Sequence, residues 1–277
     1  MFMRSTQLLF PFLFGALLLA GCDNSEVSPD SGSSDAGAAD SGHATHEDAG
    51  PVAPARVLIA FEHLANGTPI VLGTETPHTN TAGNAFGVTR LSYFVSDVTV
   101  TTAHGMTYSV PGAHYVDHDT ASTRLLAIPV DAHSVDLTSI SFVMGLPPAL
   151  NVTGAFTSPP ESLMEWPEMM GGGYHYMKLE GRYIDDAGEP FNMMVHSGGL
   201  SGTDYSFPVE LQAHGVAIGE GDVTLTLAMN IEEWFTSPNE WDLNDYFNAE
   251  RRGIMGNAAA QASLRENGAG VFTLESP

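Results

Sequence analysis

Three histidines and one methionine-rich loop are the residues of this sequence best suited to hold a metal ion. His63 and His196 each end a run with the alternating pattern of a strand, and His175 follows a loop that contains Met164 and Trp166. Imidazole and thioether groups are ligands that copper prefers, and thioether sulfur favours the cuprous ion. Histidines at strand ends around one soft, sulfur-rich loop therefore indicate a copper site.

Each of these features also has a simpler explanation. A histidine at the end of a strand is often a structural residue whose ring is hydrogen-bonded in the core, and flexible methionines often fill irregular gaps in a core loop. A metal-free surface or adhesion module with the same sandwich would carry its histidines scattered. Residue types and spacing alone do not decide between a copper site and a metal-free module with structural histidines.

The strand that follows the loop carries the only lysine of the chain. From Tyr174 the sequence alternates, so that Tyr176, Lys178, Glu180 and Arg182 share one face, and His175, Met177 and Leu179 share the other. A sole lysine one pleat from a carboxylate predicts that Lys178 and Glu180 form an ion pair that is at least partly buried.

The elements that position these residues are short strands separated by glycine, proline and aspartate. Strand character recurs at residues 56–63, 91–101, 106–110, 114–116, 124–130, 137–144, 191–196, 205–218 and 223–231. Helical signals are confined to the C-terminal third, where Asp242 is expected to cap a helix through Glu250 and Asn257 a helix over residues 258–266. Because no long helices separate the strands, the sequence predicts an all-β fold, an antiparallel β-sandwich with a few short helices near the C-terminus. Pro208 predicts an edge strand or a bulge.

The N-terminus predicts an exported lipoprotein. Residues 1–22 contain Arg4, an apolar run and the sequence Leu19-Ala20-Gly21-Cys22, which is typical of a lipoprotein signal peptide whose cysteine is acylated. Cys22 is the only cysteine, so the mature domain is expected to have no disulfide and no thiolate ligand. The protein is expected in the periplasm or at the cell surface, held to the membrane through the lipid on Cys22 alone.

The remaining chain divides into a tether and one domain. Residues 23–54 are rich in Ser, Gly, Ala and Asp without Lys or Arg, which predicts an acidic disordered tether before a domain over residues 55–277. The formal net charge of −24 at pH 7 leaves no basic stripe for a phosphate backbone, so nucleic-acid binding is not expected.

From about residue 55 onward the chain resembles the MbnP-like family of exported copper-binding proteins associated with methanobactin systems. The matching motifs are Phe61-Glu62-His63, residues 91–97, residues 141–145, Met164-x-Trp166, the string from Gly173 to Gly181, and His196-Ser197-Gly198-Gly199. The string Gly-Tyr-x-aromatic-x-Lys-x-Glu-Gly is the most specific of these. The resemblance implies an antiparallel β-sandwich, in agreement with the strand pattern.

The resemblance also implies a site. It assigns copper to histidines at the positions of His63 and His196. In some members a tryptophan, here Trp166, is oxidised to kynurenine by a dihaem oxidase partner. This chain departs from the pattern because Glu168 stands where many members carry a second tryptophan. Met164, Met169 or His175 would complete the ligand shell.

These observations together predict a copper-binding protein that holds one copper ion for uptake, storage or delivery and is not an enzyme. A copper-dependent redox enzyme is the rival within the same chemistry. Oxygenases that use an N-terminal histidine brace are excluded, since the mature N-terminus would be an acylated cysteine.

Overall fold

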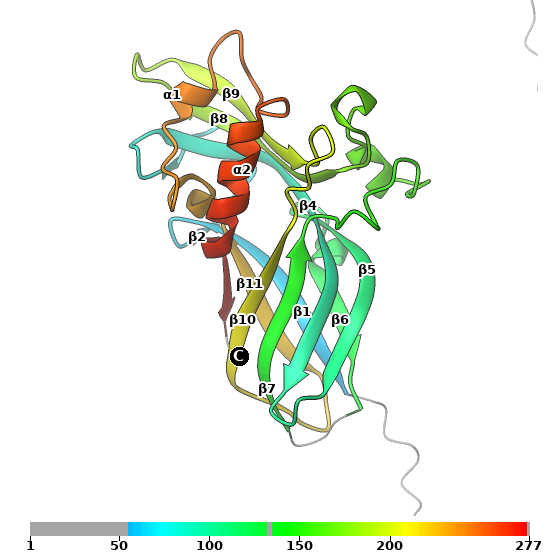
Figure 1. The fold of residues 1–277 in the computed structure, drawn as a ribbon. Coiled ribbons are helices and arrows are strands. Elements are labelled where there is room, and N and C mark those ends of the chain that lie inside the picture. Colours follow the sequence, from blue (N-terminus) through cyan, green and yellow to red (C-terminus); the bar gives the residue numbers. More distant parts are fainter. Residues whose placement is uncertain (1–54, 132–134, 276–277) are drawn as a thin grey trace, which may run out of the picture. The chain divides into compact units, whose positions relative to one another are not determined.

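Two β-sheets pack face to face to form the domain in this computed structural model, which describes residues 55–131 and 135–275 (Figure 1). The chain divides into two units, Met1–Gly50 and Pro51–Pro277, and the first lies outside the described residues. The predicted signal peptide, Cys22 and the tether over residues 23–54 therefore also lie outside them. The prediction of an antiparallel β-sandwich with few short helices is confirmed.

The smaller sheet contains five strands. Its order is β12 (Phe272–Glu275), β11 (Val223–Asn230), β1 (Arg56–Ala65) and β2 (Thr68–Pro69), with β6 (Leu125–Pro129) also paired to β1. The strand β1 is parallel to β11 and antiparallel to β6. The side chains of β1 alternate between buried and more exposed positions, as the sequence predicts. Its buried face carries Val57, Ile59, Phe61 and His63 between the sheets.

The larger sheet contains seven strands. Its order is β10 (Phe207–Ile218), β7 (Val135–Met144), β4 (Ala85–Thr102), β8 (His175–Ile184) and β9 (Pro190–Gly198), with β3 (His78–Thr79) and β5 (Thr107–Asp117) also paired to β4. Pro208 lies in the edge strand β10, as its ring predicts, because a central strand would need its missing N–H. The runs predicted at 106–110 and 114–116 join into the single strand β5 across Pro111, with a bulge opposite at Ser96–Val98.

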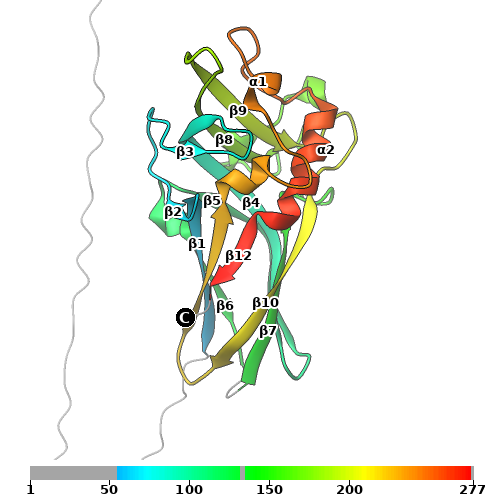
Figure 2. The same ribbon diagram turned by 90° about the vertical axis from the view of Figure 1, so that its left-hand side faces the viewer.

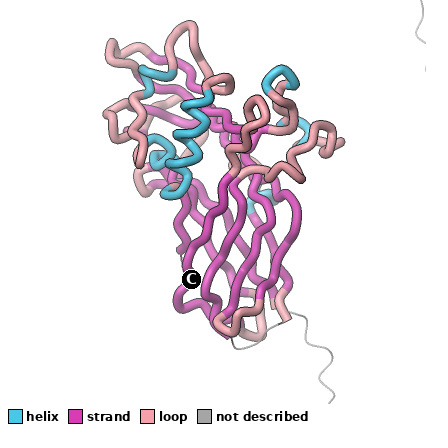
Figure 3. Tube along the Cα trace, viewed as in Figure 1, coloured by secondary structure: helices cyan, strands magenta, loops and turns pink. Residues whose placement is uncertain are grey.

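The long strand β4 changes partners along its length. Its residues Phe86–Tyr93 pair with β8, and from Val95 onward it pairs with β7 and also with β5. At the junction the amide of Gly145 donates to the carbonyl of Phe94 over 2.8 Å. The ring of Tyr176 lies only 2.7 Å from where a Cβ of Gly145 would be, so no larger residue fits there without displacing the ring. The long segment between β7 and β8 leaves the sheet at this point, and Figure 3 shows that the long loops and the helices gather at this end of the two sheets.

The helices are short. The helix α1 (Leu243–Tyr246) is capped by Asp242, whose side chain accepts from the amide of Asn244, and α2 (Ala258–Asn267) is capped by Asn257. Both predicted caps are confirmed, but the helix predicted to continue through Glu250 was wrong. Phe247 instead adopts an extended backbone, is fully buried, and accepts a hydrogen bond from the Tyr183 hydroxyl.

The described residues also form short 3₁₀ helices at Ala121–Arg124, Glu161–Met164, Glu168–Met170, Ile231–Phe235 and Gly268–Gly270. The last of them leads from α2 into β12, which pairs with β11 (Figure 2). None of the helices in the described ranges is long and apolar enough to cross a membrane.

Candidate metal centre

The neighbouring strands β8 and β9 bring His175 and His196 together. His196 lies opposite Lys178 in the ladder, and the register shifts between His175 and Met177. A bulge re-aims a side chain, and here the ring of His175 reaches the ring of His196 with centroids 5.0 Å apart at 84°. Both histidines are buried. Strict alternation predicts His175 on the opposite face from Lys178, so the sequence alone could not place these two rings together.

A backbone carbonyl fixes the tautomer of His175. Its Nδ1 lies 2.9 Å from the carbonyl oxygen of Met164, and because a carbonyl only accepts, Nδ1 must carry the proton. Burial lowers the pKa of His175 to about 3, so the ring is neutral near pH 7. The Nε2 of His175 therefore bears a free lone pair.

A carboxylate fixes the tautomer of His196 in the opposite sense. Its Nε2 lies 3.0 Å from Oε1 of Glu180, and the hydrogen bond from His196 lowers the pKa of that carboxyl group. The Nδ1 of His196 is then the atom with the lone pair, and it is buried without a hydrogen-bond partner among the described residues. Metal-binding histidines typically donate their other ring N–H to a carbonyl or a carboxylate in this manner.

Trp166 and Met164 lie beside the two histidines. The ring of Trp166 is 4.7 Å from that of His175, is almost fully buried, and has an Nε1 without a hydrogen-bond partner in the described chain. Its six-membered ring covers Gly198, where an added Cβ would lie 2.7 Å from the ring. Met164 is fully buried, with its sulfur 3.6 Å from the Ser92 hydroxyl.

The sole lysine holds the loop that carries Met164 and Trp166. The Nζ of Lys178 donates to the carbonyl of Leu163 over 2.7 Å, one residue before the carbonyl that orients His175. The predicted direct ion pair of Lys178 with Glu180 was wrong, because the Glu180 carboxylate lies 3.0 Å from His196 and 3.9 Å from Arg90. The predicted partial burial of Lys178 is confirmed, and this burial lowers its pKa.

His63 belongs to a different pair. Its Nδ1 lies 2.9 Å from Nδ1 of His118 and its Nε2 lies 3.1 Å from the Tyr93 hydroxyl. Burial lowers the pKa of His63 to about 3. Both of its ring nitrogens are thus engaged. The partner His118 follows β5 and carries no strand or loop motif that could have marked it in the sequence.

The two histidine pairs lie on opposite faces of the larger sheet. Ser92, Lys178 and His196 are aligned across β4, β8 and β9, so their side chains share one face. Tyr93, which meets His63, is next to Ser92 in sequence and points to the other face, into the core between the sheets. The structure therefore brings His175, His196, Trp166 and Met164 together and places His63 elsewhere. Met169, the other predicted methionine, is 90% exposed.

The donor set suits a soft ion better than a hard one. Among the residues that the structure describes, no three His, Cys, Asp or Glu side chains are grouped to hold a metal. The centre offers two imidazole rings, an indole beside His175 and a thioether in the same loop as the indole. Copper accepts such ligands, whereas calcium and magnesium require several oxygens.

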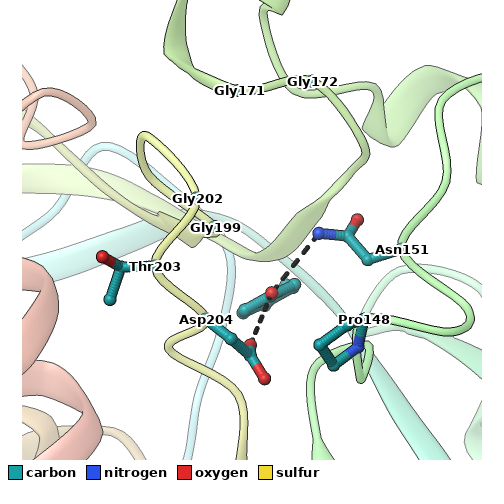
Figure 4. A pocket seen from close by; sticks show the side chains of 9 residues that line it. Pro148, Asn151, Gly171, Gly172, Gly199, Gly202, Thr203 and Asp204 are labelled. Atoms are coloured by element: carbon teal, nitrogen blue, oxygen red, sulfur yellow. Dashed lines mark hydrogen bonds between the residues drawn. The ribbon is translucent and has the colours of Figure 1, made fainter.

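A small cavity of about 140 Å³ is lined by Asn151, Gly171, Gly172, Gly199 and Asp204 among others (Figure 4), and none of His175, His196, Trp166 and Met164 lines it. The hydroxyl of Tyr176 donates to Asp204 over 2.8 Å and accepts from Asn151 over 3.3 Å. Asn151 and Thr153 in turn accept the amides of Tyr174 and Gly173. This network holds the glycine turn that precedes β8.

The comparisons with known proteins place the chain in a family. A sequence model of the MbnP family matches residues 54–255. The chain belongs to the MbnP family. The resemblance found in the motifs is thereby confirmed, and all of the centre described above lies within the matched region of this MbnP-family protein, whereas α2 lies beyond it.

One solved structure, MbnP from Methylosinus trichosporium, has a similar fold. It has 15% sequence identity and a TM-score of 0.48, and the match covers 79% of this chain and 97% of that one. No curated protein matches the chain.

Proposed function

We propose that this MbnP-family protein binds one copper ion through Nε2 of His175 and Nδ1 of His196. The observation that carries the proposal is the pair of tautomers fixed by Met164 and Glu180. These hydrogen bonds leave one lone pair on each ring, in two histidines whose rings are in contact and buried.

The surroundings favour the cuprous ion. Met164 supplies a thioether and Trp166 supplies an aromatic wall, both shielded from solvent. Soft ligands such as thioether sulfur favour Cu(I) over Cu(II). Oxidation of Trp166 to kynurenine by a dihaem oxidase partner, as the family resemblance implies, would place a new carbonyl and an amino group beside His175.

Copper is the cargo in this proposal, and the protein is not an enzyme. A lipid-anchored, acidic domain in the periplasm or at the cell surface would attract cations and hold one copper ion for uptake, storage or delivery. The alternative is a metal-free surface or adhesion module. It would use the two histidines only for structure, which leaves the unpartnered Nδ1 of His196 unexplained.

The proposal is tested by titrating the domain with Cu(I) against a chelator of known affinity. His175→Ala and His196→Ala should each weaken binding by at least a hundredfold. His118→Asn is the matched control, since it removes a histidine of the other pair, and it should leave the affinity unchanged. Equal loss in all three variants, or no tight binding by the wild-type protein from its native periplasm, would contradict the proposal.

A further inference from the structure

The outer edge of β9 carries His196 but has no neighbouring strand. In the seven-stranded sheet β9 is the terminal strand, next to β8 alone. Backbone groups on such an edge are unpaired unless another part of the chain covers them. On this edge the C-terminal segment covers them. The Met194 amide donates to the Arg252 carbonyl over 2.8 Å, and the His196 carbonyl and the Gly198 amide bond to a side chain of α2.

One side chain of α2 takes the place of a strand at His196. The Nε2 of Gln261 donates to the carbonyl of His196 over 2.8 Å, and its Oε1 accepts from the amide of Gly198 over 3.2 Å. The primary amide therefore makes the two hydrogen bonds that one residue of an adjacent parallel strand would make. Gln261 is fully buried, so water does not compete for these bonds.

The two residues that Gln261 holds are central to the metal centre. His196 carries the unpartnered Nδ1, and Gly198 is the residue on which the Trp166 ring lies. A shift of the backbone between them would move both the proposed ligand and the floor beneath the indole. We infer that Gln261 is a positioning residue for copper binding, acting through the backbone of His196 and Gly198. This inference rests on the proposed function.

The same helix offers a matched control. Ser263 also makes one hydrogen bond from α2, a partly buried one accepted from Nε1 of Trp241 over 2.6 Å, but that bond does not involve β9. A merely structural role of α2 would make the two positions equivalent for copper binding, whereas a positioning role separates them.

The test uses Gln261→Met, which keeps the length and burial of the side chain without its donor and acceptor, beside Ser263→Ala. Cu(I) affinity is measured by chelator competition, thermal stability by unfolding, and the hydrogen exchange of the Gly198 amide by NMR in the metal-free protein. Gln261→Met should lower the Cu(I) affinity about tenfold, the lower end of the effect of outer-shell partners, and speed exchange at Gly198. Ser263→Ala should change stability without either effect.

The possible results distinguish a failure of the positioning role of Gln261 from a failure of the proposed copper binding. If the wild-type protein binds Cu(I) and Gln261→Met binds it equally well, the inference is wrong while the proposed function stands. A drop in affinity that is the same in Ser263→Ala would also overturn it, because general loosening of α2 would then explain both. If the wild-type protein does not bind Cu(I), the proposed function fails and the positioning role fails with it.

Discussion

His175 and His196 differ from His63 in which ring nitrogens remain free. The bonds to Met164 and Glu180 use one nitrogen of each of the first two rings, whereas His118 and Tyr93 use both nitrogens of His63. A residue list cannot make this distinction, because it depends on the partner of each ring. Sequence reasoning could name the histidines, the tryptophan and Met164, but it could not decide which of them share a site.

The buried histidines should make stability depend on pH. His63 has a folded pKa of about 3, below the ordinary value near 6.5, so the unfolded chain binds a proton at a pH where the folded chain does not. Its contribution is complete above about pH 6.5 and is lost as the pH falls toward 3, at about 1.4 kcal/mol per pH unit. Urea unfolding of the metal-free domain from pH 7 to 4.5 measures this slope. His63→Gln should make the slope shallower by about one proton, and an unchanged slope would show that His63 does not titrate as described.

Gly198 should tolerate no side chain. An added Cβ would lie 2.7 Å from the Trp166 ring, so Gly198→Ala must displace the indole or the strand, and overpacking of this kind typically costs about 1–3 kcal/mol. Thermal or urea unfolding measures the loss. The neighbouring Gly199→Ala is the control, since its Cβ would come no closer than 3.5 Å to other atoms. Equal stability of the two variants would contradict the packing of Trp166 on Gly198.

At the scale of elements, the strands were largely predictable and the loop between β7 and β8 was not. Period-two alternation with one buried face identifies β1, β8 and β11, since each has the core on one side. The bulge between His175 and Met177 inverts that rule, because one extra residue turns His175 to the face of His196. The helix predicted through Glu250 failed because burial of Phe247 outweighed local helical propensity.

Lys178 is one of the groups that hold the loop of Met164 and Trp166. Lys178→Met would leave the Leu163 carbonyl without its donor, and the adjacent carbonyl of Met164 would orient His175 less firmly. A hydrogen bond that involves a charged group typically contributes about 1.5–3 kcal/mol, and exposure to water reduces this, so global stability should fall only modestly. The sharper readout is the imidazole ¹⁵N spectrum of the metal-free protein, in which His175 should change from a single tautomer to a mixture.

Lys178→Arg is the conservative comparison, because it keeps a charged donor at the same position. A His175 signal that stays a single tautomer in Lys178→Met would show that the loop does not need the lysine.

At the scale of the whole molecule, the sequence predicts a domain suspended from a membrane by lipid. Cys22→Ala should abolish acylation and lipoprotein signal processing, because this cysteine is the residue that carries the lipid. Fractionation with metabolic labelling by a fatty-acid analogue measures this outcome. Processing and membrane association that both stay unchanged in Cys22→Ala would contradict the lipid anchor.

Copper binding by His175 and His196 is measured most directly by the imidazole ¹⁵N NMR spectrum of the domain before and after loading with one equivalent of Cu(I). The signals of Nε2 of His175 and Nδ1 of His196 should shift on loading. The protonated Nδ1 of His175 and Nε2 of His196 should keep their protons, and the signals of His63 and His118 should stay in place. Shifts confined to His63 and His118, with His175 and His196 unchanged, would contradict copper binding by those last two residues.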